Sequence, residues 1–177
     1  MSSDQTLTTI TLPNDGSLYF NVARHLTVGC SGDDVSLVQY LLARAPDAEP
    51  YLTGANNFQL TGLCPIGVAD VDGIWGPDTA AAMAWFEQAC TNPPVYRDGA
   101  IDPLGSVPYG DQQVFINSGG AYFFKLSVLQ DLYVIAQSKA IVTDTGTRNS
   151  TLRKMAADGQ CPSTLASNPL LAAEATV

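Results

Sequence analysis

Apolar and polar positions change their period along the chain, and each period predicts a different element. Residues 6–23 hold two short β-rich runs around the sequence Pro-Asn-Asp-Gly at 13–16, which is typical of a tight turn. The second run places Leu18, Phe20 and Val22 on one face, at the two-residue period of a strand. We therefore expect an N-terminal β-hairpin, which must pack on the body of the protein or on a partner to be stable.

The rest of the pattern is mainly helical. Apolar residues recur at helical spacing over 35–45 and again over 77–90, where Pro77 suits the first position of a helix. The longest helical pattern covers 121–139 and is apolar on two sides. Such a helix is either buried or packed against another chain.

The segments between these helices are less regular. Residues 46–70 contain several prolines and glycines and no clear period, which predicts a long loop or insertion. Ser150 is expected to cap a short helix that ends near Ala157, and the tail after Pro162 to run over a surface or fray. The predicted fold class is mainly α. We expect an N-terminal β-hairpin arm at 1–26, a small helical bundle at 27–110 with an insertion at 46–70, and a C-terminal helical extension at 111–177.

Composition narrows the classes of partner. The chain has 177 residues, of which 46% are apolar and 14% charged, and eight basic against 17 acidic side chains give a net charge of −9. A protein this acidic repels a phosphate backbone, so we expect no nucleic-acid partner. No stretch approaches the length of apolar sequence that a membrane span requires, so we expect none.

Candidate catalytic and metal-binding chemistry is sparse. The four cysteines are far apart, no CxxC pair occurs, and there is one histidine, so we expect no metal site and no cofactor. Whether the cysteines form disulfides stays open. His25 and Cys30 lie on an irregular segment, where we interpret them as a surface histidine and a packed thiol. We therefore expect a protein that is not an enzyme.

The clearest internal signal is a repeated turn. The sequence Asp-Gly-Ile-Trp-Gly-Pro at 72–77 returns 26 residues later as Asp-Gly-Ala-Ile-Asp-Pro at 98–103. Each copy supplies Asp-Gly for a tight turn and an apolar residue that can enter the core. The two copies lie on either side of the helix predicted over 77–90.

These turns carry a resemblance to a known family. The stretch Gly-Asp-Asp-Val-Ser-Leu-Val-Gln at 32–39, the sequence Asp-Gly-Ile-Trp-Gly-Pro-Asp-Thr at 72–79, the Trp-Phe-Glu at 85–87 and the second Asp-Gly resemble the peptidoglycan-binding-domain-like family. The resemblance covers about residues 27–105 and implies a three-helix module that recognises bacterial cell wall. The chain departs from the family pattern in its long insertion, at Glu87 in place of Gln, at Asp102 in place of Gly, and in lacking a Thr after Pro103.

Five residues are candidates for contacting a wall ligand. Asp72 would shape the site at the first turn, and Trp75 would either stack on a sugar ring or, the interpretation we favour, lie in the core. Tyr96, Arg97 and Asp98 combine an aromatic ring with charged groups on one loop, which suits an amidated stem peptide and sugar hydroxyls. An ordinary solvated turn would explain the same three residues equally well.

The functional hypothesis is therefore noncatalytic recognition of peptidoglycan, as an adaptor within a larger particle or machine. The alternative is a structural subunit of a virion or injection-type assembly that uses the same fold to bind protein neighbours. Residues 1–6 lack a basic region and an apolar run, so we expect no Sec signal peptide. An extracellular or wall-facing location would then be reached within a virion or a secreted assembly.

Overall fold

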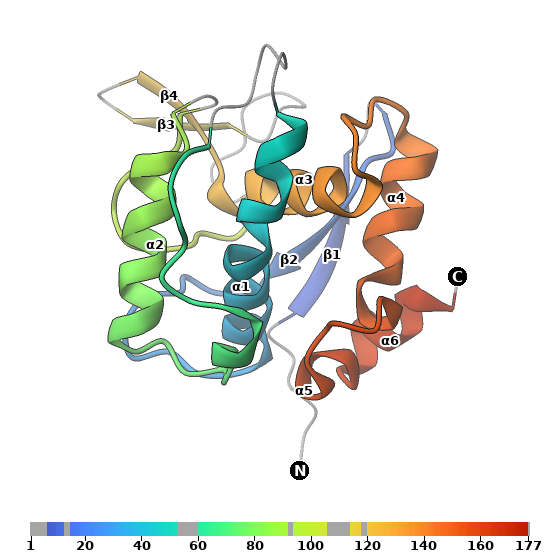
Figure 1. The fold of residues 1–177 in the computed structure, drawn as a ribbon, viewed down its shortest axis with the longest axis horizontal. Helices are drawn as coiled ribbons and strands as arrows, with labels where there is room; N and C mark the ends of the chain where they lie inside the picture. The colour runs from blue at the N-terminus through green and yellow to red at the C-terminus, as the bar shows by residue number, and fades with distance from the viewer. Residues whose placement is uncertain are drawn as a thin grey trace.

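The computed structural model describes residues 7–12, 15–52, 60–91, 94–105, 114–117 and 120–176. The protein is mainly helical and has an N-terminal antiparallel hairpin, as predicted (Figure 1). Its elements follow the chain in the order β1 (Leu7–Thr11), β2 (Leu18–Val22), α1 (Asp33–Arg44), η1 (Ala45–Tyr51), η2 (Val68–Asp70), α2 (Pro77–Ala89), β3 (Val114–Asn117), β4 (Gly120–Phe123), α3 (Lys125–Ser138), α4 (Thr145–Arg153), η3 (Lys154–Ala157), α5 (Ser163–Ala166) and α6 (Pro169–Ala175), where η marks a short 3-10 helix.

The β1–β2 hairpin packs on the body of the protein through side chains that bind its backbone. The Gln130 side chain of α3 accepts from the Phe20 N–H at 2.7 Å and donates to the Phe20 carbonyl at 2.8 Å, as a neighbouring strand would. Asn149 of α4 accepts from the Leu18 N–H at 2.9 Å. The outer edge of β2 is therefore bound by two helices, which supplies the support that an isolated hairpin lacks.

Helix α1 is the centre of the molecule. It contacts α2, α3 and α5, and in Figure 1 it lies between α2 and the C-terminal helices. Because it has neighbours on several sides, nearly all of its residues are buried, polar ones such as Ser36 and Gln39 included. The apolar core is one continuous cluster to which the hairpin, α1, α2, α3 and the C-terminal helices all contribute.

The helix predicted over 121–139 begins later than expected. Residues 120–123 form β4, which pairs antiparallel with β3, and α3 begins only at Lys125. The aromatic run Tyr-Phe-Phe at 122–124 is apolar enough for a helix, but aromatic side chains also favour strands. The burial predicted for this helix is confirmed, because most of α3 lies in the core.

Two expectations for the C-terminal extension are wrong in detail. Helix α4 begins at Thr145 rather than at Ser150, because Asp144 caps it and accepts from the Thr147 N–H at 2.8 Å. The tail is helical rather than frayed, since Leu165 of α5 and Leu171 of α6 are fully buried. The burial of these two leucines in the core therefore holds the C-terminal helices against the body of the protein.

The predicted insertion 46–70 contains short helical turns in its described part. It holds η1, which packs on α3, and η2, while residues 53–59 lie outside the described residues.

Over the described part of the chain, no helix combines the length and the apolarity needed to cross a bilayer.

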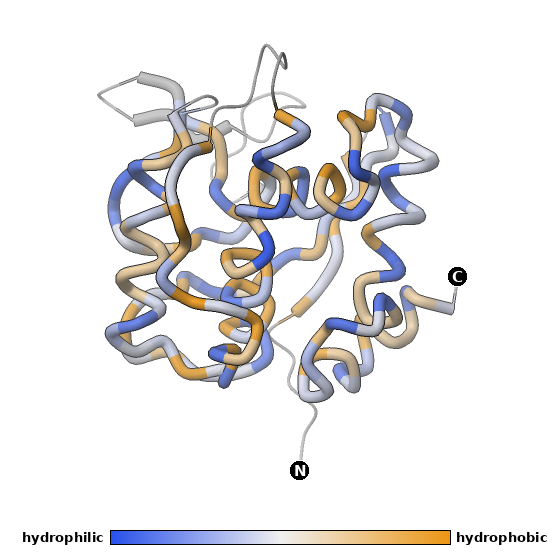
Figure 2. Tube along the Cα trace, viewed as in Figure 1, coloured by the Kyte–Doolittle hydropathy of each residue, from blue (hydrophilic) through white to orange (hydrophobic). Residues whose placement is uncertain are grey.

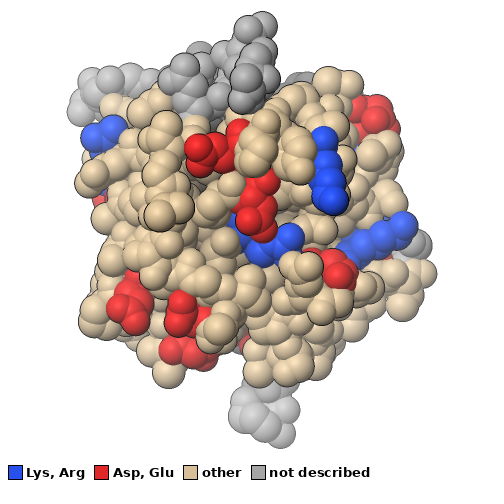
Figure 3. Space-filling model, viewed as in Figure 1, with Lys and Arg blue, Asp and Glu red and all other residues tan. Residues whose placement is uncertain are grey.

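Polar and charged residues are spread over the outside. In Figure 2 the helix α4 carries mostly polar residues, and Leu152 is its buried contribution to the core. On the face shown in Figure 3 the acidic side chains are scattered over a mostly uncharged surface, some of them beside Lys or Arg. The net negative charge therefore does not gather into a single acidic patch on this face.

Candidate functional site

The two Asp-Gly turns flank one irregular segment of the chain, residues 24–32. Leu26 exchanges backbone hydrogen bonds with Ile101 of the second turn at 2.8 and 2.9 Å. The backbone N–H of Trp75 in the first turn donates to the Cys30 carbonyl at 2.9 Å. The repeat in the sequence thus corresponds to two turns held against the same segment.

The turns also share their local geometry. The Asp72 carboxylate accepts from the Ile74 N–H at 3.0 Å, and the Asp98 carboxylate accepts from the Ala100 N–H at 3.1 Å. The glycine that follows each aspartate has a positive φ, 76° in the first turn and 72° in the second. Both features are those of an Asp-Gly turn, which confirms this interpretation of the repeat.

The first turn is held by the buried side chain of Gln39 on α1. Its Oε1 accepts from the N–H groups of Asp72 and Gly73 at 3.1 and 2.9 Å. Its Nε2 donates to the Asp72 carboxylate at 3.0 Å, the Ile74 carbonyl at 2.9 Å and the Thr79 hydroxyl at 2.8 Å. The bonds from the Ile74 N–H and from Gln39 hold the pKa of Asp72 below its ordinary value. The Asp72 carboxylate thus stabilises the first turn, although the residue remains exposed.

Trp75 lies in the core, as the favoured interpretation predicted. Its side chain is 1% exposed, so no face of the ring is open to a sugar. The indole N–H has no hydrogen-bond acceptor among the described residues. Trp75 therefore shapes the protein from within and is not a surface contact for a ligand.

The second turn is held by an ionic cluster that joins α2, α3 and the loop. The Lys125 ammonium lies 2.7 Å from the Glu87 carboxylate and 2.6 Å from the Asp98 carboxylate, and it donates to the Tyr96 carbonyl at 2.8 Å. Glu87 also accepts from the Gly99 N–H at 2.7 Å. The side chains of Lys125 and Glu87 are buried, at 6% and 7% exposure. Asp98 thus supports the loop rather than pointing freely at a ligand.

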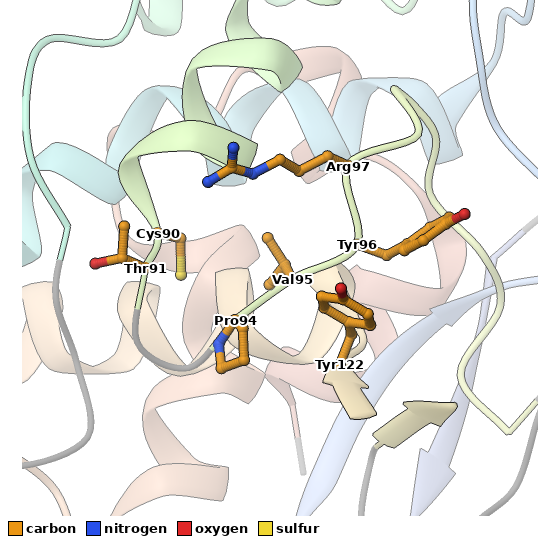
Figure 4. A pocket seen from close by; sticks show the side chains of 7 residues that line it. All are labelled: Cys90, Thr91, Pro94, Val95, Tyr96, Arg97 and Tyr122. Atoms are coloured by element: carbon orange, nitrogen blue, oxygen red, sulfur yellow. The ribbon is translucent and has the colours of Figure 1, made fainter. Parts of the chain in front are cut away.

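Beside this cluster a cavity of about 420 Å³ opens on the surface (Figure 4). Figure 4 shows the Arg97 side chain extending above Val95 toward Cys90 and Thr91, while the Tyr96 ring points in the opposite direction and Tyr122 lies below Val95. We call this cavity the Arg97 pocket, and its lining residues are Cys90, Thr91, Pro94, Val95, Tyr96, Arg97 and Tyr122.

Strand β4 brings a second aromatic ring to the Arg97 pocket. The Phe123 N–H donates to the Pro94 carbonyl at 2.9 Å, and Val95 forms a parallel bridge with Phe123. This pairing places the rings of Tyr96 and Tyr122 edge to face, with centroids 5.5 Å apart and planes at 64°. The two rings form an aromatic wall that is partly exposed to solvent.

Arg97 differs from the other arginines of the protein. Its side chain is exposed and forms no ion pair with any carboxylate in the described part of the chain. Arg24, Arg44, Arg148 and Arg153 all pair with acidic side chains. The guanidinium of Arg97 is therefore available to a ligand.

Cys90 closes one side of the Arg97 pocket as a neutral group. It is buried at 3% exposure, and burial raises the pKa of its thiol to about 12. It therefore contributes an uncharged, apolar surface at neutral pH.

A second hollow of about 410 Å³ lies at the first turn and the start of α2. It carries three carboxylates, those of Asp70, Asp72 and Asp78. Asp70 accepts from the Gly67 N–H at 2.8 Å, so two of the three act as caps of local backbone. No group of three His, Cys, Asp or Glu side chains in the described ranges is arranged to hold a metal ion.

Cys30 contacts the backbone of His25, not its ring. The His25 ring nitrogen Nδ1 lies 2.7 Å from the Asp102 carboxylate, and the Cys30 sulfur lies 3.9 Å from the His25 carbonyl oxygen. Asp102, one of the departures from the family pattern, thus links the second turn to the segment 24–32.

Sequence reasoning selected only some of the residues that line the Arg97 pocket. It identified Tyr96 and Arg97 on one loop, and the structure places both in the Arg97 pocket. It missed Tyr122, because the approach of this residue depends on the pairing of β4 with the loop, and it missed Thr91, which follows the end of α2.

No protein-family model, curated protein or solved structure matches this chain.

Proposed function

We propose that this protein recognises bacterial peptidoglycan without catalysis and that the Arg97 pocket is its ligand site. One observation carries the proposal: the Arg97 guanidinium, which pairs with no described carboxylate, lines the same surface cavity as the Tyr96–Tyr122 pair. A cavity with aromatic walls and a few polar groups is the usual form of a site for a small ligand. Tyr96 and Arg97 are also two of the residues that the sequence analysis selected, because they combine an aromatic ring and a cation on one loop.

The chemistry of peptidoglycan suits such a site. Its sugars present apolar ring faces that can pack on tyrosine, and its acetamido and hydroxyl groups can bond to Thr91 or to the tyrosine hydroxyls. Its stem peptides present carbonyl and carboxyl groups to which a guanidinium can donate. A module of this kind would act as an adaptor that brings a larger particle to the wall.

Preorganisation supports the same role. The loop that carries Arg97 is fixed at the Tyr96 carbonyl and at the Gly99 N–H by buried charged partners. A loop that is already ordered loses little conformational entropy when a ligand binds. The ionic cluster of Glu87, Asp98 and Lys125 therefore serves the site even though only its neighbours line the pocket.

Co-sedimentation with purified, insoluble sacculi tests the proposal. We expect saturable pelleting of the wild-type protein and at least about tenfold weaker binding of a Tyr96→Ala, Arg97→Ala double variant, since both contacts are lost. Lys154→Gln is the matched control, because it removes an exposed cation from the C-terminal extension and should bind as the wild type does.

Three results separate the alternatives. Loss of pelleting in the double variant, while the wild type and Lys154→Gln still pellet, supports both the function and the site. Equal pelleting of all three proteins would keep wall recognition and reject the Arg97 pocket. Absence of pelleting by the folded wild-type protein would reject wall recognition and favour a subunit that binds protein neighbours.

A further inference from the structure

The charge of the Arg97 pocket is unusual for this protein. The molecule carries a net charge of −9, yet the described residues that line the pocket include one cation, Arg97, and no carboxylate. The hollow at the first turn is the opposite case, since the described residues that line it include three aspartates and no cation. The Arg97 pocket is thus a local site for an anionic group on an acidic molecule.

The nearby acidic side chains do not neutralise Arg97. Glu87 and Asp98 are the carboxylates of the adjoining cluster, and both lie within 2.7 Å of the Lys125 ammonium. Neither forms an ion pair with Arg97. The desolvated Lys125 therefore holds the two acidic groups in place, and the Arg97 guanidinium pairs with neither of them.

The backbone on both sides of Arg97 is fixed. Lys125 binds the Tyr96 carbonyl before it, and Glu87 binds the Gly99 N–H after it. In Figure 4 the Arg97 side chain extends from this fixed loop toward Thr91. A guanidinium presents a planar fork of N–H donors that matches a carboxylate with two parallel hydrogen bonds.

We infer that the Arg97 pocket selects a free carboxylate on a short peptide, and that it discriminates against the corresponding carboxamide. This inference rests on the proposed function and names the chemical group that the site reads. The carboxylate would pair with Arg97, while Val95, Pro94 and the edge of Tyr122 would contact the adjoining small alkyl side chain. A carboxamide keeps the shape but offers no charge and one fewer acceptor.

Sacculi whose carboxyl groups have been converted to carboxamides with carbodiimide and ammonia provide the first test. We expect the wild-type protein to bind native sacculi about tenfold more tightly than amidated sacculi, which corresponds to about 1.4 kcal/mol. Arg97→Gln should bind both preparations equally and weakly. Lys154→Gln should retain the discrimination of the wild type.

A second test does not depend on the wall. Acetyl-alanyl-alanine and its C-terminal amide are titrated into the wild-type protein and into Arg97→Gln by calorimetry. We expect the acid to bind the wild type at least about tenfold more tightly than the amide, and the variant to lose this preference.

Failure of the carboxylate inference and failure of the proposed function give different results in these tests. Equal binding of acid and amide by the wild-type protein, in either test, would overturn the inference and leave wall recognition standing. Preference for the acid peptide without any pelleting of sacculi would support the carboxylate site and overturn the proposed function. A preference that survives in Arg97→Gln would place the carboxylate elsewhere and overturn the inference.

Discussion

Gly73 and Gly99 hold equivalent positions in the two turns but have different surroundings. A Cβ atom at Gly73 would lie 2.9 Å from the Ser36 hydroxyl oxygen and 3.3 Å from the Gly32 carbonyl oxygen, whereas nothing lies within 4 Å at Gly99. We expect Gly99→Ala to lower the unfolding free energy by about 1 kcal/mol, the cost of a positive φ. Gly73→Ala should cost about 3 kcal/mol, because the added methyl also displaces its neighbours.

Urea unfolding of the two variants measures this difference directly. The m-value should stay near that of the wild type in both, so that the midpoint reports stability. Equal losses in the two variants would mean that the contact between the first turn and α1 is not tight. The sequence predicts the positive φ at both glycines, but the approach of Ser36 depends on how α1 packs.

Single residues also show where sequence reasoning stops. The turn role of Asp72 and the core position of Trp75 follow from a local pattern, and the structure agrees with both. The engagement of Asp98 by Lys125 could not be predicted, because the two residues are 27 positions apart and meet only when α3 packs beside the loop.

At the scale of elements, Lys125 joins α3 to α2 and to the second turn. Lys125→Met should lower the unfolding free energy by about 3 kcal/mol, because it leaves the buried Glu87 carboxylate and the Asp98 carboxylate without a cation. Combining it with Glu87→Gln and Asp98→Asn should recover part of that loss, since no unpaired charge then remains.

Thermal unfolding of the single and triple variants tests this role of the cluster. Lys139→Met is the control, because Lys139 is exposed and pairs with no described carboxylate, and its effect should stay within about 0.5 kcal/mol. A triple variant less stable than Lys125→Met would contradict an ionic origin and indicate that the side chains act through packing or neutral hydrogen bonds.

The elements that sequence reasoning missed are those that depend on distant partners. The β1–β2 hairpin has its own turn between two β-rich runs and could be predicted. The sequence pattern predicts β4 as the start of a helix, because its apolar residues continue into α3 and its strand partners are β3 and Val95. Helices α5 and α6 are short, and they are ordered through the burial of Leu165 and Leu171.

At the scale of the whole molecule, Asp158 ties the C-terminal extension to the core. Its carboxylate accepts from the hydroxyl of Tyr40 on α1 at 2.6 Å and from that of Tyr133 on α3 at 2.8 Å. Burial alone would raise the pKa of Asp158, but these bonds and those from the N–H groups of Gln160 and Cys161 outweigh it and lower the pKa.

A lowered pKa makes this link sensitive to acid. The unfolded chain binds a proton at Asp158 at a higher pH than the folded protein does, so its contribution to stability is complete above the unfolded pKa of about 4. That contribution is lost as the pH falls through the lower folded pKa. We expect the unfolding free energy to decrease between about pH 5 and pH 2, and to decrease less steeply in Asp158→Asn.

Urea unfolding across this pH range, with Asp15→Asn as the control, checks the prediction. Asp15 is exposed and makes one local bond to the Ser17 N–H, so its variant should keep the slope of the wild type. An Asp158→Asn variant with an unchanged slope would mean that other carboxylates carry the acid sensitivity.

The central claim is that the Arg97 pocket, rather than the acidic hollow at the first turn, binds wall fragments. Backbone and tyrosine NMR shifts, followed while soluble peptidoglycan fragments are titrated into the protein, test it most directly. We expect saturable changes at Thr91, Val95–Arg97 and Tyr122 and none at Asp70, Asp72 or Asp78. Saturable changes confined to the three aspartates, or no changes at all, would contradict the claim.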